Sequence, residues 1–249
     1  MAGTGTVPTE PDLILPILEQ GDMELEGVLP YSSNYSFLAT ITLNGQSLRC
    51  VYKPRDGENP LGDFPYGTLC QRETAAFVIS EALGWGLVPP TCLREGEHGT
   101  GSVQLFIPHN PEEHYFTVRY QACHAAALRR LTVFDWVVNN ADRKSGHCLV
   151  GEGPRLWAID HGICFHSLYK LRTVTWEFAG QAIEPEHLAD LETCRDRAAD
   201  PDSRTGRALE SLLSAAEREA LVLRMERLLV NPRYPCHRRD RRNFPWPPI

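Results

Sequence analysis

The chain has 249 residues, of which 42% are hydrophobic and 23% charged, and its formal net charge is -7. A net negative charge argues against a general nucleic-acid binder, so no nucleic-acid partner is expected. No apolar run is long enough to span a bilayer, and the N-terminus lacks the basic and apolar regions of a signal peptide. We therefore expect a cytoplasmic protein with no transmembrane segment.

The eight cysteines stand singly, without a C-x-x-C pair, and most fall inside apolar runs. This spacing favours reduced, buried thiols over disulfides. Of the 25 basic residues only Lys53, Lys144 and Lys170 are lysine. A bias toward arginine codons is enough to explain their scarcity, but each lysine is still a candidate for a specific role.

The first part of the chain is predicted to form an N-terminal extension over residues 1–21, with a short helix over 13–21 that Pro16 breaks. Three antiparallel strands are predicted next, over residues 23–30, 36–43 and 46–54. Asn44-Gly45 between the last two is the strongest short hairpin signal. The polar loop 31–36, YSSNYS, offers amides and hydroxyls that could cover an anion.

A helix is predicted over residues 67–83, ending at Gly84. Glu73 lies four residues from both Leu69 and Phe77, so it projects along the apolar stripe of this helix. A core-facing carboxylate requires a partner, and Lys53 at the end of the third strand is the candidate. The alternative is a Glu73 at the edge of the stripe that reaches water.

Strands over residues 88–95 and 101–108 complete a five-stranded sheet in a small β-rich lobe, residues 22–110. A larger helical lobe, residues 111–230, begins after the linker 108–113. Helices are predicted over 120–138, 186–198 and 206–229, with an irregular segment before residue 183. Residues 231–249 are a proline- and arginine-rich tail, mobile or docked on the surface, that could contact an acidic partner or a lipid headgroup.

Two aspartates, Asp142 and Asp160, flank a predicted hairpin. Residues 147–150 and 155–159 carry strand patterns, and the turn between them centres on Gly153. A hairpin brings its open ends together, so both aspartates are expected to face the same small volume. Two converging carboxylates repel each other unless a cation or a proton lies between them.

Four segments in this order resemble protein-kinase-like folds: a lysine in VYKP, a glutamate in RETAAF, the loop NNADRKSGH and the turn IDHG. They look most like the phosphoinositide 3-/4-kinase-like family and its short bacterial branch, over roughly Gly27 to Phe165. The resemblance implies a two-lobed α+β protein-kinase-like fold with ATP and Mg2+, or Mn2+, bound between the lobes. It also implies an ATP-dependent phosphotransferase acting on a hydroxyl of a lipid, a protein or a small molecule.

The resemblance implies a role for each motif residue. Lys53 would hold the α and β phosphates, and Glu73 would fix its position. Asp160 would bind the magnesium ion. Asp142, with Arg143 beside it in the catalytic loop, would orient the acceptor hydroxyl and accept its proton. The other nucleotide-binding candidates are Ser32, Ser33, Gln104, Phe106 and Ile159.

One position departs from the family pattern, because His147 stands where a metal-binding asparagine is usual. Imidazole is a poorer ligand for magnesium than for manganese or zinc. His147 therefore puts the second metal and the efficiency of transfer in question. His161, in the metal turn, is expected to pack or hydrogen-bond rather than to bind metal.

Three alternatives to a kinase remain. The chain could be a pseudokinase that binds nucleotide as a regulatory module, or an enzyme that transfers adenylate from a reversed nucleotide. It could also be a metal-dependent hydrolase, although that hypothesis leaves Lys53 and Glu73 unexplained. The hydrolase ligands would be His147, Asp160, His161 and His166, with Asp142. The acceptor and the oligomeric state stay open.

The segment 163–183 stands where the resemblance places an acceptor loop. It carries Lys170, Arg172 and Trp176. Packing and solvated charge are equally good explanations for these residues, and for Trp176 packing is the favoured one.

Overall fold

A computed structural model describes residues 10–30, 34–240 and 242–249, and the chain divides into two compact units. The first unit comprises residues 1–74 and 89–106, and the second comprises residues 75–88 and 107–249. The boundary between residues 74 and 75 falls within helix α2 (Leu69–Ala82). This helix confirms the one predicted over 67–83.

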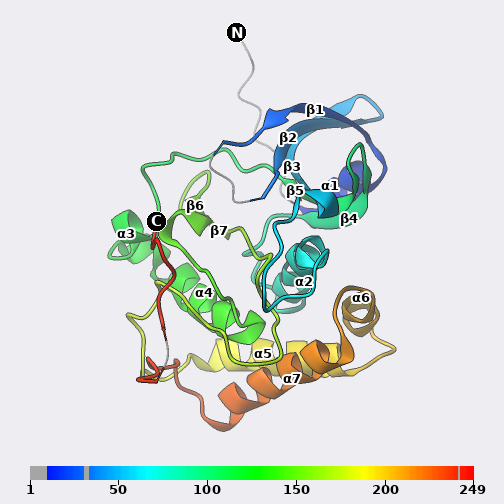
Figure 1. The fold of residues 1–249 in the computed structure, drawn as a ribbon. Coiled ribbons are helices and arrows are strands. Elements are labelled where there is room, and N and C mark those ends of the chain that lie inside the picture. The colour runs from blue at the N-terminus through cyan, green and yellow to red at the C-terminus, as the bar shows by residue number, and fades with distance from the viewer. Residues whose placement is uncertain (1–9, 31–33, 241) are drawn as a thin grey trace. The chain divides into compact units, whose positions relative to one another are not determined.

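The first unit contains an antiparallel sheet with the strand order β1-β2-β3-β5-β4 (Figure 1). Its strands confirm the five predicted ones: β1 (Asp22–Val28), β2 (Phe37–Leu43), β3 (Gln46–Pro54), β4 (Thr91–Gly96) and β5 (Gly99–Leu105). Asn44 and Gly45 both have positive φ, 50° and 80°, as a two-residue hairpin turn requires. The turn sets the register in which Leu43 pairs with Gln46.

Helix α1 (Pro11–Gln20) lies in the predicted N-terminal extension, packs against β4 and belongs to the first unit. The prediction that Pro16 breaks this helix is wrong, because the helix runs through it. A proline inside a helix removes one backbone hydrogen bond and costs ~3 kcal/mol or more. Burial of Ile14 and Leu18, both fully inaccessible, offsets that cost.

The second unit contains the later part of α2, then the short helix α3 (Tyr115–Val118) and the longer α4 (Ala125–Val138), which follows a 3-10 turn, η2 (Ala122–His124). Another 3-10 turn, η3 (Ser145–His147), leads into β6 (Cys148–Val150), which pairs with β7 (Leu156–Ala158). The hairpin predicted between Asp142 and Asp160 is therefore confirmed. Gly153 has φ 68° in its turn.

Helices α5 (Pro185–Ala199) and α7 (Ala215–Val230) pack side by side (Figure 1). The single helix predicted over 206–229 is wrong, because α6 (Arg204–Leu212) ends before α7 begins. Ser214 interrupts it as a helix N-cap. Its side chain and that of Glu217 form a capping box at the start of α7.

Six of the eight cysteines are buried, Cys123 and Cys236 are exposed, and all eight are free thiols, as the sequence predicts. Burial raises the pKa of the Cys194 thiol to about 12, which keeps it protonated and unreactive. Among the described residues, no helix is long and apolar enough to cross a membrane.

Candidate functional site

Lys53 and Glu73 form an ion pair in the first unit. Lys53 lies near the end of β3 and Glu73 in the first half of α2, and Nζ is 2.5 Å from Oε1. The Glu73 side chain is only 4% exposed, whereas that of Lys53 is 24% exposed. The pair predicted from the apolar stripe is confirmed, because a carboxylate buried this deeply needs a counter-charge. The ammonium is the solvent-accessible end of the pair.

The other candidates in the first unit lie on or after β5. Gln104 is buried, and its Nε2 donates to Thr91 Oγ1 on β4 at 2.8 Å. Phe106 follows β5, with the guanidinium of Arg49 5.1 Å from the ring centroid. Ser32 and Ser33 lie outside the described residues.

In the second unit a fully buried ion pair stands behind the Asp142 loop. Arg143 Nε is 3.1 Å from Asp135 Oδ1 and 3.2 Å from Oδ2, and both side chains are inaccessible to solvent. Burial by itself lowers the pKa of Arg143, but the negative charge of Asp135 overcomes this effect and raises it. Arg143 therefore stays charged and contacts protein groups only.

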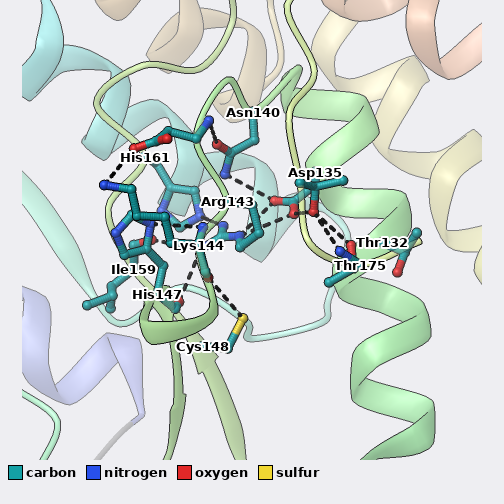
Figure 2. Close-up of polar contacts among 12 residues, drawn as sticks. Thr132, Asp135, Asn140, Arg143, Lys144, His147, Cys148, Ile159, His161 and Thr175 are labelled. Carbon is teal, nitrogen blue, oxygen red and sulfur yellow. Dashed lines mark hydrogen bonds and ion pairs between the residues drawn. The ribbon is translucent and has the colours of Figure 1, made fainter. Parts of the chain in front are cut away.

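The rest of the Arg143 guanidinium joins the two ends of the hairpin (Figure 2). Its Nη1 donates to the carbonyl of His147 at 3.1 Å and to that of Ile159 at 2.8 Å. Its Nη2 lies 2.6 Å from His161 Nε2. His161 is thus a hydrogen-bonding residue, as expected. One side chain therefore fixes the loop before β6 against the turn after β7.

Asp142 and Asp160 interact, as the hairpin predicts. Burial raises the pKa of Asp142, and the charge of Asp160 raises it further. Lys144 opposes the shift, because its Nζ lies 3.3 Å from Asp142 Oδ2. The backbone N–H of Asp142 donates to Asn140 Oδ1 at 2.9 Å, which fixes the loop at this point.

Asp160 has a left-handed backbone with φ 61°. A residue other than glycine in this region stores strain, and such residues cluster at functional sites. Its side chain is 49% exposed, and Oδ2 lies 3.2 Å from His147 Nε2. His147 therefore faces the same carboxylate that would bind the metal.

The oxygen and nitrogen atoms at this site fit a magnesium ion that takes only some of its ligands from the protein. No group of three or more His, Cys, Asp or Glu side chains within the described ranges is arranged to hold a metal. Magnesium usually binds one or two carboxylates and completes its octahedron with water and substrate phosphates. Asp160, a single carboxylate, matches that pattern, and the imidazole of His147 beside it suits manganese better than magnesium.

Two of the histidines proposed as ligands in the hydrolase hypothesis, His161 and His166, form hydrogen bonds with other protein groups. His161 Nε2 faces Arg143, and His166 Nδ1 accepts the backbone N–H of Leu168 at 2.9 Å. These contacts use ring nitrogens that a metal would need. The structure brings His147 to Asp160, but it does not gather these histidines around one point.

Three further residues help to hold the Asp142 loop: Asp135, Asn139 and Asn140. Asp135 lies four residues after Leu131 on the apolar face of α4, and this spacing indicates a core-facing carboxylate, as it does for Glu73. Asn139 ends α4 in a left-handed conformation and donates from Nδ2 to the carbonyls of His166 and Leu168, both at 2.8 Å. Asparagine at this position is a common helix-ending signal.

A basic hollow of about 400 Å3 lies beside the Asp142 loop. Residues 168–172 and Arg242 line it, and Lys170, Arg172 and Arg242 supply its positive charges. The charge of Arg172 reaches Asp142, whose pKa it lowers. Trp176, four residues after Arg172 in the sequence, is buried, as expected for a packing residue.

Comparisons with known proteins identify the family and the fold of the chain. Residues 93–192 match the family described as phosphatidylinositol 3- and 4-kinase. The chain is 37% identical to Protein Rv2133c of Mycobacterium tuberculosis (strain ATCC 25618 / H37Rv) over 264 residues, which cover 93% of this chain and 94% of that protein. The fold is similar to the crystal structure of a Helicobacter pylori proinflammatory kinase, CtkA. The TM-score is 0.51 at 12% identity, over 87% of this chain and 94% of that one.

The fold is therefore protein-kinase-like, of the α+β class. The chain belongs to the phosphatidylinositol 3- and 4-kinase-like family, in a short bacterial branch that includes Protein Rv2133c.

Proposed function

We propose that the chain is an ATP-dependent phosphotransferase that uses Mg2+ or Mn2+ and transfers phosphate to a hydroxyl group. The observation that carries this proposal is the convergence of Asp142 and Asp160. The negative charge of Asp160 raises the pKa of Asp142, and the buried Arg143 joins the loop that bears Asp142 to Ile159, the residue before Asp160. Phosphoryl transfer needs a carboxylate for the metal beside one for the acceptor.

Each charged residue has one task in this proposal. Lys53, held by Glu73, neutralises phosphate oxygens of the nucleotide. Asp160 would hold the metal ion, which would supply positive charge against the phosphates of the nucleotide. Asp142 orients the acceptor hydroxyl and accepts its proton. Burial raises the pKa of Asp142, and this makes it a better proton acceptor than an ordinary carboxylate.

Arg143 acts as a positioning residue rather than a catalytic one. Its side chain is fully buried, so it reaches neither nucleotide nor acceptor. It acts through the carbonyls of His147 and Ile159, which it holds. Ile159 precedes Asp160, so this contact sets the direction of the metal-binding carboxylate.

The basic hollow supports an acceptor with a negatively charged group. Lys170, Arg172 and Arg242 bring three positive charges to its wall, and Arg172 is close enough to act on Asp142. A phosphate or a carboxylate near the reacting hydroxyl would complement these charges. The acceptor remains a lipid, a protein or a small molecule within that class.

The experiment has two stages. Thermal shift with ATP and either metal tests nucleotide binding, because a ligand at ~100 times its Kd adds roughly 2.7 kcal/mol of stability. ATP labelled separately at the γ and α positions then identifies the transferred group. Label transferred only from the γ position supports the kinase, and label from the α position supports adenylyl transfer. Binding without transfer from either position defines a pseudokinase, and an absent shift with every purine nucleotide would refute the proposal.

A further inference from the structure

The described residues of the C-terminal segment, 232–240 and 242–249, pack against the rest of the second unit. Tyr234 near its start is 1% exposed, and its hydroxyl donates to Glu184 Oε2 at 2.6 Å. Arg233 forms a backbone bridge with Ala182. Of the two arrangements expected for this tail, docking is the observed one.

The middle of the C-terminal segment forms hydrogen bonds with residues 173–176, which directly follow the residues of the basic hollow. The carbonyl of Asn243 accepts the backbone N–H of Thr173 at 3.1 Å and the indole N–H of Trp176 at 3.2 Å. The Asn243 side chain bonds both the N–H and the carbonyl of Arg238, at 3.0 and 2.8 Å, and so closes a local loop. The ring of His237 packs on Trp176 with centroids 4.5 Å apart.

The end of the C-terminal segment contacts the candidate catalytic loop itself. The carbonyl of Pro248 accepts the backbone N–H of Ser145 at 2.8 Å, three residues after Asp142. The C-terminus lies beside α3 and β6 (Figure 1). Ser145 Oγ accepts the N–H of Phe116 at 3.1 Å and lies 2.8 Å from His114 Nδ1. Ser145 is therefore fixed from both sides, by α3 and by Pro248.

The middle contact also reaches the buried ion pair. Thr173 Oγ1 donates to Asp135 Oδ2 at 3.1 Å. The backbone of Arg143 bonds on both sides of Thr173, to the carbonyl of Arg172 at 3.0 Å and to the N–H of Val174 at 3.2 Å. The Asn243 contact thus supports the residue that links Asp135 to Arg143. One contact of the C-terminal segment therefore ends on the loop that carries Asp142, and a second ends on Thr173, whose neighbours Arg172 and Val174 bond to that loop.

We propose that the C-terminal segment is a positioning element of the candidate active site, which holds the Asp142 loop and the adjoining segment 172–176 in place. The effect on loop order follows from the contacts alone. The effect on turnover rests on the proposed function. Misplacing a catalytic group by about 1 Å can cost roughly 100-fold in rate, so these contacts are expected to matter for catalysis.

Two chain lengths give a matched test. A chain ending at Pro245 loses the carbonyl that binds Ser145 but keeps Asn243. A chain ending at Pro248 lacks only Ile249 and keeps that acceptor oxygen. Hydrogen exchange of peptides over residues 140–148 reports loop order without any assay of activity. We expect exchange at Ser145 to be roughly tenfold faster in the shorter chain and unchanged in the longer one.

A full-length variant covers the case in which truncation impairs folding. Asn243→Ala removes the two bonds that close the loop to Arg238, so exchange at Thr173 is expected to rise. Arg239→Ala, at an exposed position in the same segment, is the control and is expected to change nothing. Turnover should fall roughly tenfold or more in the chain ending at Pro245, while nucleotide Kd changes by less than about twofold.

The outcomes separate this proposal from the proposed function. Unchanged exchange at Ser145 and Thr173 in the altered chains overturns the positioning role. Faster exchange with unaltered turnover overturns it as well, because the loop would then not need the segment for catalysis. Faster exchange in a protein whose full-length form transfers no phosphate refutes the kinase proposal and leaves the structural contact established.

Discussion

Replacing Asp135 by asparagine tests whether the buried ion pair organises the candidate site. Asparagine keeps the size of the side chain but removes the charge that faces Arg143. Because neither side chain of the pair is accessible to solvent, the guanidinium would be left buried without a counter-charge. Removing one partner of such a pair costs ~3 to 5 kcal/mol. At about 2 to 4 °C per kcal/mol for a chain of this size, the expected fall in Tm is roughly 6 to 20 °C.

Urea unfolding and calorimetry measure the loss of stability in Asp135→Asn, and two further variants serve as comparisons. Asp196→Asn breaks the exposed contact with Arg195 and is expected to leave Tm unchanged. The double variant Asp135→Leu, Arg143→Met removes both charges and should recover much of the stability. It should not recover turnover, because methionine cannot donate to the carbonyl of Ile159. A loss below about 1 kcal/mol for Asp135→Asn, with full turnover, would refute the organising role.

The remaining predictions concern the charged residues of the site. Asp160→Asn should weaken metal-dependent nucleotide binding in calorimetric titrations. Asp142→Asn should keep the nucleotide Kd within about twofold and lower kcat roughly 100-fold. The opposite pattern would reverse the two roles. His147→Asn should preserve or improve rates with Mg2+ relative to Mn2+, and a change in Tm alone would make His147 a packing residue. Lys53→Met should weaken nucleotide binding while circular dichroism stays native, and loss of fold would instead identify a structural ion pair. Because only the ionised carboxylate accepts a proton, kcat should fall as pH drops through the raised pKa of Asp142. An apparent pKa on the acid side of the kcat–pH profile that is no higher than that of an ordinary carboxyl group would contradict that role.

The sheet and most helices are predictable because their signals are local. The Asn44-Gly45 turn specifies a hairpin, and alternation of apolar residues specifies the strands beside it. Glu73 could be paired with Lys53 for a similar reason, since a carboxylate on an apolar helix stripe must find a cation. Each of these inferences needs only neighbouring residues and a general rule about burial.

Other features depend on contacts between distant residues. Helix α1 continues through Pro16 because Ile14 and Leu18 pack against the sheet, and no local propensity reports that burial. Arg143 stands beside Asp142 in the sequence, which suggested a shared catalytic role. Only the structure shows that Arg143 turns into the core while the Asp142 carboxylate faces Lys144.

All three lysines of the chain lie at charged parts of the candidate site. Lys53 contacts Glu73, Lys144 contacts Asp142, and Lys170 lines the basic hollow. A codon bias toward arginine would be enough to make lysine rare, but it would not place each lysine at a group to which the proposed function gives a role in phosphate chemistry. A lysine ammonium is a compact charge on a flexible stem, so it can follow a carboxylate or a phosphate oxygen as the ligand arrives. Arginine, with its planar fork, serves where the geometry is fixed, as Arg143 does against Asp135.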